Sequence, residues 1–245
     1  MTDSTSGHAV SPAAAGIDPA AAKIPSPHRS GLKLPRPRKH WTPRYVVNRV
    51  ALWWWQKQNP EAPWLTADAV NFLSTWLRPG DTVAEFGSGR STLFFARQVG
   101  PSGFVASAEH HEQWHTEVTG RLKSAGISNT VYALAPKEEA GYIAAASTAL
   151  AGRRPNLALV DGLHRDACAL WAMDAVRPGG IVAIDNVQRY LPHRTFAPYA
   201  IGQYGAPASP RWQQFWATAS TWRCLWTSNG IEDTVFFFKP DSAQP

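Results

Sequence analysis

Apolar residues between positions 82 and 184 gather in short uninterrupted runs, and amphipathic segments separate these runs. Four or five consecutive apolar residues are typical of a strand buried on both faces, and apolar residues at helical spacing predict helices between them. This alternation predicts a parallel sheet covered by helices on both sides. The predicted strands are 82–86, 104–108, 130–133, 157–160 and 181–184, and the predicted helices are 91–99, 112–125, 138–150 and 165–176.

The C-terminal part follows a different pattern. Residues 212–219 predict a helix, and residues 222–227 and 234–239 predict two strands joined by the turn residues 228–230. A strand pair after a parallel unit suggests that the last strand inserts antiparallel. The predicted fold class is therefore α/β, a Rossmann-like doubly wound sheet of seven strands, mostly parallel, with one antiparallel strand near the C-terminus.

A helical extension is predicted ahead of the first strand. Residues 43–58 and 66–77 have apolar residues near helical spacing. The adjacent residues Trp53, Trp54 and Trp55 cannot all share one face of a helix, so one or two of them should pack on the body. Another can meet a partner subunit or a substrate, and a homodimer through this helix is compatible with the sequence. The predicted division is a tail (1–40), a helical extension (41–80) and a main domain (81–240).

The positive charge of the chain is concentrated in its first residues. Positions 1–49 hold eight Lys or Arg and two Asp or Glu, whereas the remaining 196 positions hold sixteen of each. Residues 1–40 are also rich in Pro, Ala and Ser, which predicts a disordered tail that could touch an acidic partner or a membrane surface. A neutral body argues against a nucleic-acid substrate, because enzymes of that kind carry positive charge near the site.

Cysteine content and hydropathy predict a cytoplasmic protein. Cys168 and Cys224 are the only cysteines and form no CxxC pair, so a disulfide framework is not expected. The longest apolar run, residues 50–55, is too short to cross a bilayer, and the N-terminus has no apolar core of a signal peptide.

A glycine turn lies between the first predicted strand and the helix that follows it. Gly87 and Gly89 flank Ser88, and the missing Cβ atoms let the backbone turn tightly and let a ligand approach closely. Ser91 and Thr92 can cap the helix, whose free N–H groups form a polar and slightly positive cradle.

The residues around this turn favour a positively charged ligand over a nucleotide phosphate. Thr92 stands where a dinucleotide site has its third glycine, and no Lys follows the turn as in a phosphate loop. Glu85, directly before the turn, would repel a phosphate. The run from Glu85 to Thr92 resembles motif I of the class I S-adenosylmethionine-dependent methyltransferases. In that family the glycine turn passes under the cofactor, and the acidic residue acts near its amino-acid end.

The resemblance extends to the second strand. Family members end this strand with an acidic residue that binds both ribose hydroxyls, and Glu109 fills this place, twenty residues after Gly89. His110, the next residue, would then lie beside the adenine. As an alternative, Glu109 is a surface residue at a strand end.

Two further strands end in polar residues. Asp161 follows the fourth predicted strand, and Asp185 and Asn186 follow the fifth. Because the carboxyl ends of adjacent parallel strands meet, these side chains should converge. Three oxygen ligands suit a hard cation such as Mg²⁺, and the pattern resembles the metal-dependent, catechol O-methyltransferase type of the family. Metal-free members also have acidic residues here, where Asp161 bonds backbone N–H groups or the cofactor, so both readings stay open.

His164 takes the place of the lysine base of catechol-type enzymes, three residues after Asp161. A histidine with a pKa near neutrality can act as a base, and a helix cap or a solvated side chain is the alternative role. Residues 187–210 form a connection that is too long for a plain loop and is typical of a lid or substrate wall.

The resemblance implies transfer of a methyl group from S-adenosylmethionine to a small-molecule acceptor, at a hydroxyl oxygen, with or without Mg²⁺. The alternatives are a metal-free N- or carboxyl-methyltransferase and a non-catalytic cofactor-binding scaffold for a partner. A polyamine-synthase-like aminopropyl transferase shares the fold, but residues 185–212 lack the acidic groove that a polyamine needs.

Overall fold

The computed structural model describes residues 42–241, so the tail predicted for residues 1–40 lies outside the described residues. The strands are β1 (Thr82–Phe86), β2 (Phe104–Glu109), β3 (Thr130–Leu134), β4 (Leu157–Val160), β5 (Ile181–Asp185), β6 (Arg223–Ser228) and β7 (Asp233–Phe238). The helices are α1 (Pro43–Gln58), α2 (Ala67–Trp76), α3 (Arg90–Val99), α4 (Glu112–Ser124), α5 (Glu139–Leu150), α6 (Arg165–Ala175) and α7 (Pro210–Ala219), with a 3₁₀ turn, η3 (Val187–Arg189).

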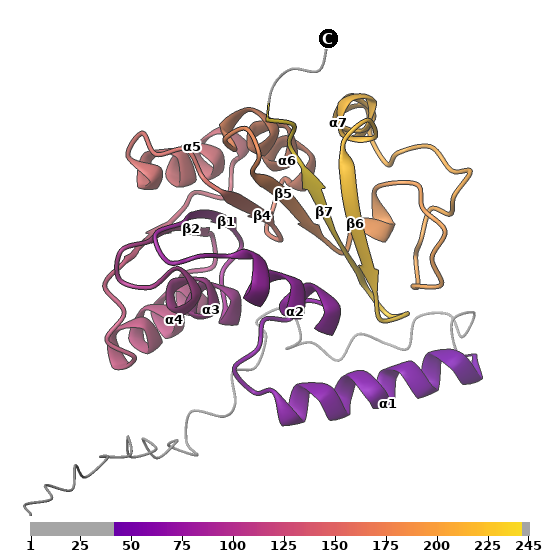
Figure 1. Ribbon diagram of the computed structural model, residues 1–245, viewed down its shortest axis with the longest axis horizontal. Coiled ribbons are helices and arrows are strands. Elements are labelled where there is room, and N and C mark those ends of the chain that lie inside the picture. Colours follow the sequence, from indigo (N-terminus) through magenta and orange to yellow (C-terminus); the bar gives the residue numbers. More distant parts are fainter. Residues whose placement is uncertain (1–41, 242–245) are drawn as a thin grey trace, which may run out of the picture. The chain divides into compact units, whose positions relative to one another are not determined.

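All seven strands form one sheet in the order β3-β2-β1-β4-β5-β7-β6 (Figure 1). Strands β1 to β5 run parallel, and β7 is antiparallel to both of its neighbours, β5 and β6. The predicted fold class is confirmed, including the inserted antiparallel strand. This register sets Asp185, at the end of β5, opposite Thr234 at the start of β7.

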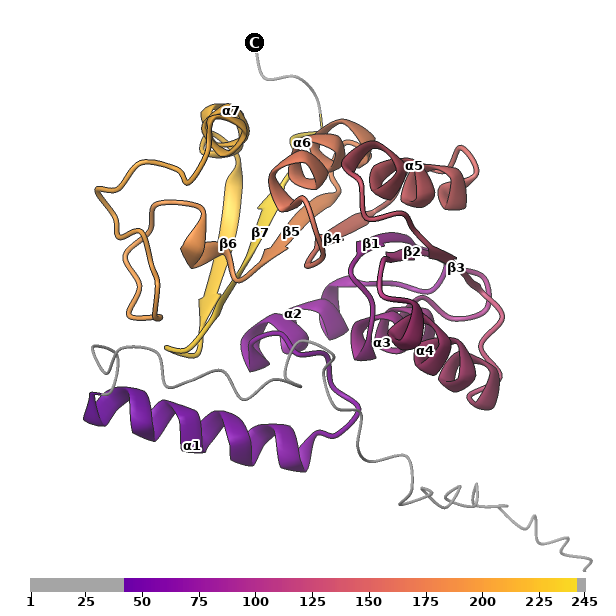
Figure 2. The ribbon, with the colours of Figure 1, turned by 180° about the vertical axis from the view of Figure 1, so that it is seen from behind.

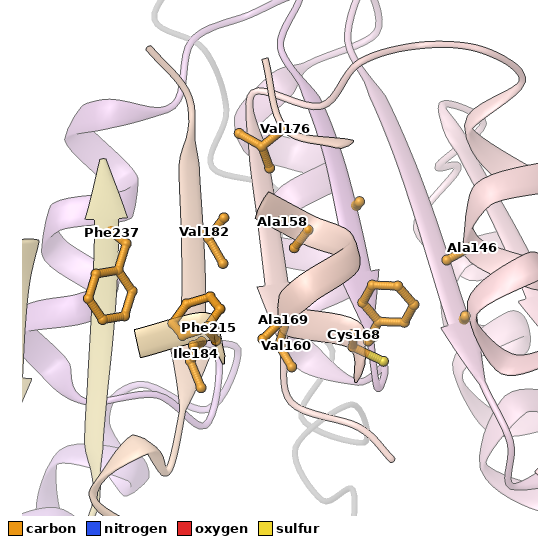
Figure 3. Close-up of a cluster of buried hydrophobic side chains, with 14 of the residues drawn as sticks. Ala146, Ala158, Val160, Cys168, Ala169, Val176, Val182, Ile184, Phe215 and Phe237 are labelled. Carbon is orange, nitrogen blue, oxygen red and sulfur yellow. The ribbon is translucent and has the colours of Figure 1, made fainter. Parts of the chain in front are cut away.

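Helices cover both faces of the sheet, and the alternation of side chains along each strand divides the core in two (Figures 1 and 2). In β1, Val83 packs on the side of α2 and α3, whereas Ala84 and Phe86 pack on the side of α5, α6 and α7. Figure 3 shows part of this second cluster, in which Phe215 of α7 lies near Ile184 and Phe237 of the sheet.

The predicted element ends differ from the observed ones by no more than two residues. Helix α7 begins at Pro210 instead of Trp212, because Ser209 caps it and accepts a hydrogen bond from the Trp212 N–H group. The predicted lid contains η3, which the sequence pattern did not indicate.

Helix α1 exposes most of its apolar residues. Leu52 is buried, and Trp55 is partly buried against the α2–α3 side of the core, as expected for one of the three tryptophans. Trp53 and Trp54, by contrast, point outward. Across residues 42–241 no helix combines the length and hydropathy that a membrane span requires.

Candidate cofactor and acceptor site

The glycine turn at the end of β1 packs directly against the end of β4. Gly87 has a φ of +87°, and a Cβ atom there would lie 2.8 Å from the backbone N of Gly162. A side chain at this position would both strain the backbone and collide with Gly162. The turn therefore holds its position by contact between two backbones, immediately beside Asp161.

Glu85 lies under this turn and is completely buried. Its Oε2 accepts hydrogen bonds from the hydroxyls of Thr92 and Ser107, both at 2.6 Å. The Thr92 hydroxyl in turn accepts from the Gly89 N–H group at 3.0 Å, so the carboxyl is linked to the turn. Burial raises the pKa of Glu85 to about 7, against the effect of the hydrogen bonds from Ser107, Ser91 and Thr92.

The second oxygen of Glu85, Oε1, is buried and has no hydrogen-bond partner among the described residues. A buried acceptor without a donor is costly, by about 1–3 kcal/mol. The carboxyl is thus suited to a ligand that brings a donor and a positive charge.

Glu109 ends β2 and organises the opposite side of the turn. Its Oε2 accepts from both the N–H group and the hydroxyl of Ser88, and its Oε1 accepts from the N–H groups of His110 and His111 at 2.8 Å. Because the Ser88 hydroxyl donates to the carboxylate, the Tyr132 hydroxyl, 2.6 Å away, must donate to Ser88. Glu109 is thereby oriented at the edge of the sheet before any ligand binds.

Aromatic residues support the turn from the α4 and α5 sides. The Trp114 indole donates to the Ser88 carbonyl at 2.9 Å and stacks on Trp64. The buried Tyr142 packs edge-on against His110 and lies so close to Gly162 that a Cβ there would collide with its hydroxyl. These contacts fix both glycine-containing strand ends.

Arg165 joins the ends of β4 and β5. Its guanidinium donates to the carboxylate of Asp161 at 2.7 Å, to the Asp161 carbonyl at 2.8 Å and to the Asp185 carbonyl at 2.5 Å. A fourth bond from Nε reaches the Gly162 carbonyl at 3.1 Å. The predicted convergence of Asp161 and Asp185 is thus organised around an arginine.

The Asp185 carboxyl is buried and has its own partners. It accepts from the Thr234 hydroxyl at 2.7 Å and from the Asn186 amide at 2.9 Å. Burial, and next the negative charge of Asp161, hold the pKa of Asp185 well above its usual range.

Comparison with known proteins adds sequence and fold evidence. The sequence model of the protein-L-isoaspartate(D-aspartate) O-methyltransferase family (PCMT) matches residues 34–148. This range contains the glycine turn and Glu109 and ends before Asp161. The chain is a class I S-adenosylmethionine-dependent methyltransferase.

Solved structures agree with the fold of this methyltransferase. An O-methyltransferase from Bacillus cereus, in complex with S-adenosylhomocysteine, is 17% identical over 80% of this chain and 89% of its own, with a TM-score of 0.53. The O-methyltransferase TomG from Streptomyces achromogenes, in complex with S-adenosylmethionine, is 18% identical over 71% and 81%, with a TM-score of 0.51. A search of curated protein sequences gave no significant match.

The methyltransferase brings its predicted cofactor residues together. Glu85, the turn and Glu109 surround one end of β1, and Thr92 links two of them. These residues fit S-adenosylmethionine: the turn leaves room for close approach, Glu109 offers a carboxylate to hydroxyls, and the unpartnered Oε1 of Glu85 suits an ammonium group.

The residues predicted to bind Mg²⁺ do not fit a metal in this arrangement. Arg165 already supplies a positive charge beside Asp161, and both oxygens of the Asp185 carboxyl accept hydrogen bonds. Asn186 contacts Asp185 through its amide nitrogen, which is a donor and not a metal ligand.

His164 lies at the start of α6 with its ring turned away from the pair. Its Nε2 is 2.8 Å from the Lys137 carbonyl, and its Nδ1 is 3.8 Å from the Glu139 carboxylate. Since a carbonyl only accepts, Nε2 carries the proton, and the ring must move before Nε2 could act as a base. His164 does not cap α6 with its side chain.

Sequence reasoning missed Arg165, Trp114, Tyr132 and Tyr142. Arg165 could have been found from its i, i+4 spacing to Asp161, which favours an ion pair. The aromatic residues lie in different elements from the turn, and nothing local in the sequence connects them to it.

Proposed function

We propose that this methyltransferase transfers the methyl group of S-adenosylmethionine to a small-molecule acceptor at a hydroxyl oxygen. The observation that carries the proposal is the direct contact of the glycine turn with Gly162, which sets the donor cradle beside Asp161. An acceptor at this edge would have both a methyl donor and a carboxylate within reach. Most of the rate enhancement then comes from holding the two reactants in line.

The chemistry requires a base and no other reacting group. A lone pair of the acceptor oxygen forms the bond to the methyl carbon as the carbon–sulfur bond breaks, and the sulfur keeps that electron pair. Asp161 is the best-placed group to take the hydroxyl proton, because it is one-third exposed and Arg165 fixes its orientation. His164 would support the same step only after leaving the Lys137 carbonyl.

Glu109 is proposed to bind the ribose hydroxyls, and Glu85 the amino group of the donor. Both Glu109 oxygens already accept two hydrogen bonds each, so ribose binding requires one to be released. The Ser88 hydroxyl is the group that can be released at least cost, because it already has the Tyr132 hydroxyl as a second partner.

A pocket at the edge of the sheet where β5 ends supports an acceptor that carries an anionic group. It lies between the first turn of α1, the segment after β5 and the β6–β7 turn, with a volume of about 280 Å³. Arg44 and Arg194 line it, and no lining residue is acidic. Asn229 adds a buried amide nitrogen that has no partner among the described residues.

Titration calorimetry with S-adenosylhomocysteine tests the donor half, and release of S-adenosylhomocysteine in a screen of phenols, sugars and carboxylates tests the acceptor half. We expect binding, and turnover that survives EDTA and is lost in Asp161→Asn. Asp68→Asn, an exposed change on α2, is the matched control. Absence of cofactor binding would overturn the enzyme proposal, and binding without turnover of any acceptor class would favour a scaffold.

A further inference from the structure

Helix α1 carries a continuous apolar face that none of the described residues covers. Its members are spaced at i, i+1, i+4, i+7 and i+8, the spacing of one helix face. Their exposed fractions range from 45% to 66%, which is far above those of a packed helix face. The apolar face of α1 consists of Val46, Val47, Val50, Trp53 and Trp54.

The opposite face of α1 is fixed to the body, so the apolar face cannot turn inward. Leu52 is buried and Trp55 joins the core on the α2–α3 side. At the first turn, the Arg44 guanidinium lies 3.9 Å from the ring centroid of Phe196. Rotating α1 to bury its apolar face would expose Leu52 and break these contacts.

The charge of α1 has one sign. The helix contains Arg44, Arg49 and Lys57 and no acidic residue. Lys57 emerges within the apolar face, where its ammonium group lies 5.2 Å from the ring centroid of Trp53. The first 49 residues of the chain also hold its whole positive excess.

Two features argue against a second copy of the chain as the partner of this face. An isologous contact would set two helices with only basic charges against each other. A stable dimer also needs about 20–30 residues on each side, and the apolar face of α1 has five.

An anionic bilayer surface matches every one of these features. Interfacial helices insert an apolar face to shallow depth, carry Trp at the level of the headgroups and extend Lys or Arg toward anionic lipids. We propose that α1 docks the protein on the surface of a membrane that contains anionic lipids. This proposal does not depend on the methyl acceptor.

Flotation of the full-length chain with vesicles tests the proposal. The vesicles contain phosphatidylcholine alone or phosphatidylcholine with phosphatidylglycerol at about three to one. We expect flotation with the anionic vesicles only, with weaker flotation at high salt because screening reduces the attraction. Trp53→Ser/Trp54→Ser should lower the bound fraction by about tenfold, because binding scales with the buried apolar area.

Two controls keep the result interpretable. Tyr204→Ser changes a highly exposed aromatic residue outside α1 and should float like the wild type. Calorimetry with S-adenosylhomocysteine should give the same affinity for the wild type and the double variant, which shows that the variant is folded.

The proposal is overturned if the chain does not float with anionic vesicles, or if the double variant floats as well as the wild type. It is also overturned if light scattering finds a dimer that the double variant loses, since a second copy would then cover the face. Capture of an acidic protein in place of vesicles, lost in Arg49→Gln/Lys57→Gln, would overturn it in favour of a protein partner.

Discussion

The donor half of the site and the acceptor half are built in different ways. Around β1 and β2, the carboxylates of Glu85 and Glu109 bond to groups within or next to one short turn. Around β5 and β7, the polar groups come from segments far apart in the chain: the side-chain amide oxygen of Gln188, for example, accepts from the Asp233 N–H group.

Both halves contain buried polar atoms without a partner among the described residues, and Glu85 Oε1 is such an atom on the donor side. On the acceptor side, Gln188, His193, Asn229 and Asp233 each have a buried polar atom with no partner among residues 42–241. Such atoms are expensive to leave unpaired, and two of these residues, Gln188 and Asp233, contact each other. The donor side thus leaves a carboxylate oxygen unpaired beside one turn, whereas the unpaired atoms of the acceptor side come from segments far apart in the chain.

Arg165 differs from the other polar groups of the acceptor side, because its hydrogen bonds are already formed. Its removal should have the largest effect on stability of the changes considered. Arg165→Met removes every hydrogen bond from this guanidinium and leaves Asp161 without its cationic partner. We expect a loss of about 3 kcal/mol in the free energy of unfolding, measured by urea denaturation, because a partly buried ion pair is broken and three backbone carbonyls lose their donor.

Arg154→Met is the matched control for this prediction. Arg154 also donates to several backbone carbonyls, those of Asp174, Ala175 and Val176, but it is exposed and forms no ion pair with a carboxylate of residues 42–241. Its loss should cost less than about 1 kcal/mol. Equal losses of unfolding free energy in the two variants would mean that Arg165 stabilises the fold only by bonding backbone carbonyls. Its ion pair with Asp161 would then contribute nothing.

Glu109→Gln tests whether the donor half depends on a carboxylate. The amide nitrogen of Gln cannot accept the N–H groups that one Glu109 oxygen now accepts. We expect the affinity for S-adenosylhomocysteine, measured by calorimetry, to fall by about 10- to 100-fold, as for hydrogen bonds to a charged group. Glu112→Gln, three residues further on the exposed start of α4, should change it less than about twofold; a similar loss in both variants would remove Glu109 from the ribose site.

The same contrast explains what the sequence could and could not predict. The donor half is local: a buried strand, Glu85, two glycines and a strand-end Glu109 form a pattern with known chemistry. The sheet was predictable because continuous apolar runs and their alternation with helices determine it. The acceptor half depends on contacts such as Arg165 with Asp185 and Asp185 with Thr234, which only the folded sheet creates.

The orientation of α1 was unpredictable for a related reason. Its sequence has an apolar stripe that would ordinarily face the core, yet the stripe faces outward. Periodicity identifies the helix and its apolar face, but it does not say what covers that face.

The raised pKa of Glu85 should make the donor half, and not the acceptor half, depend on pH near neutrality. The expected effect is smaller than that of Glu109→Gln. Because the folded pKa is about 7 against an ordinary 4.5, the unfolded chain releases this proton first, and apo stability should fall as pH rises from about 4.5 to 7. Affinity for S-adenosylhomocysteine should rise by about fivefold between about pH 6 and pH 7, as ionised Glu85 meets the ligand's ammonium group. Calorimetry on Glu85→Gln, which mimics the protonated carboxyl, should show no such rise; an identical rise would assign the titration to another group.

Arg194→Gln should have the smallest effect and should be confined to the acceptor half. Arg194 is exposed at the rim of its pocket, so its charge is partly screened by solvent. With an anionic acceptor from the turnover screen, we expect KM to rise about threefold, with kcat and donor affinity unchanged, because only uniform ground-state binding is lost. Arg97→Gln, which removes an exposed arginine of α3 paired with Glu61, should leave all three constants unchanged. A changed affinity for S-adenosylhomocysteine in Arg194→Gln would show that the two halves are coupled. An unchanged KM for the acceptor would show that the arginine-lined pocket is not part of the acceptor site.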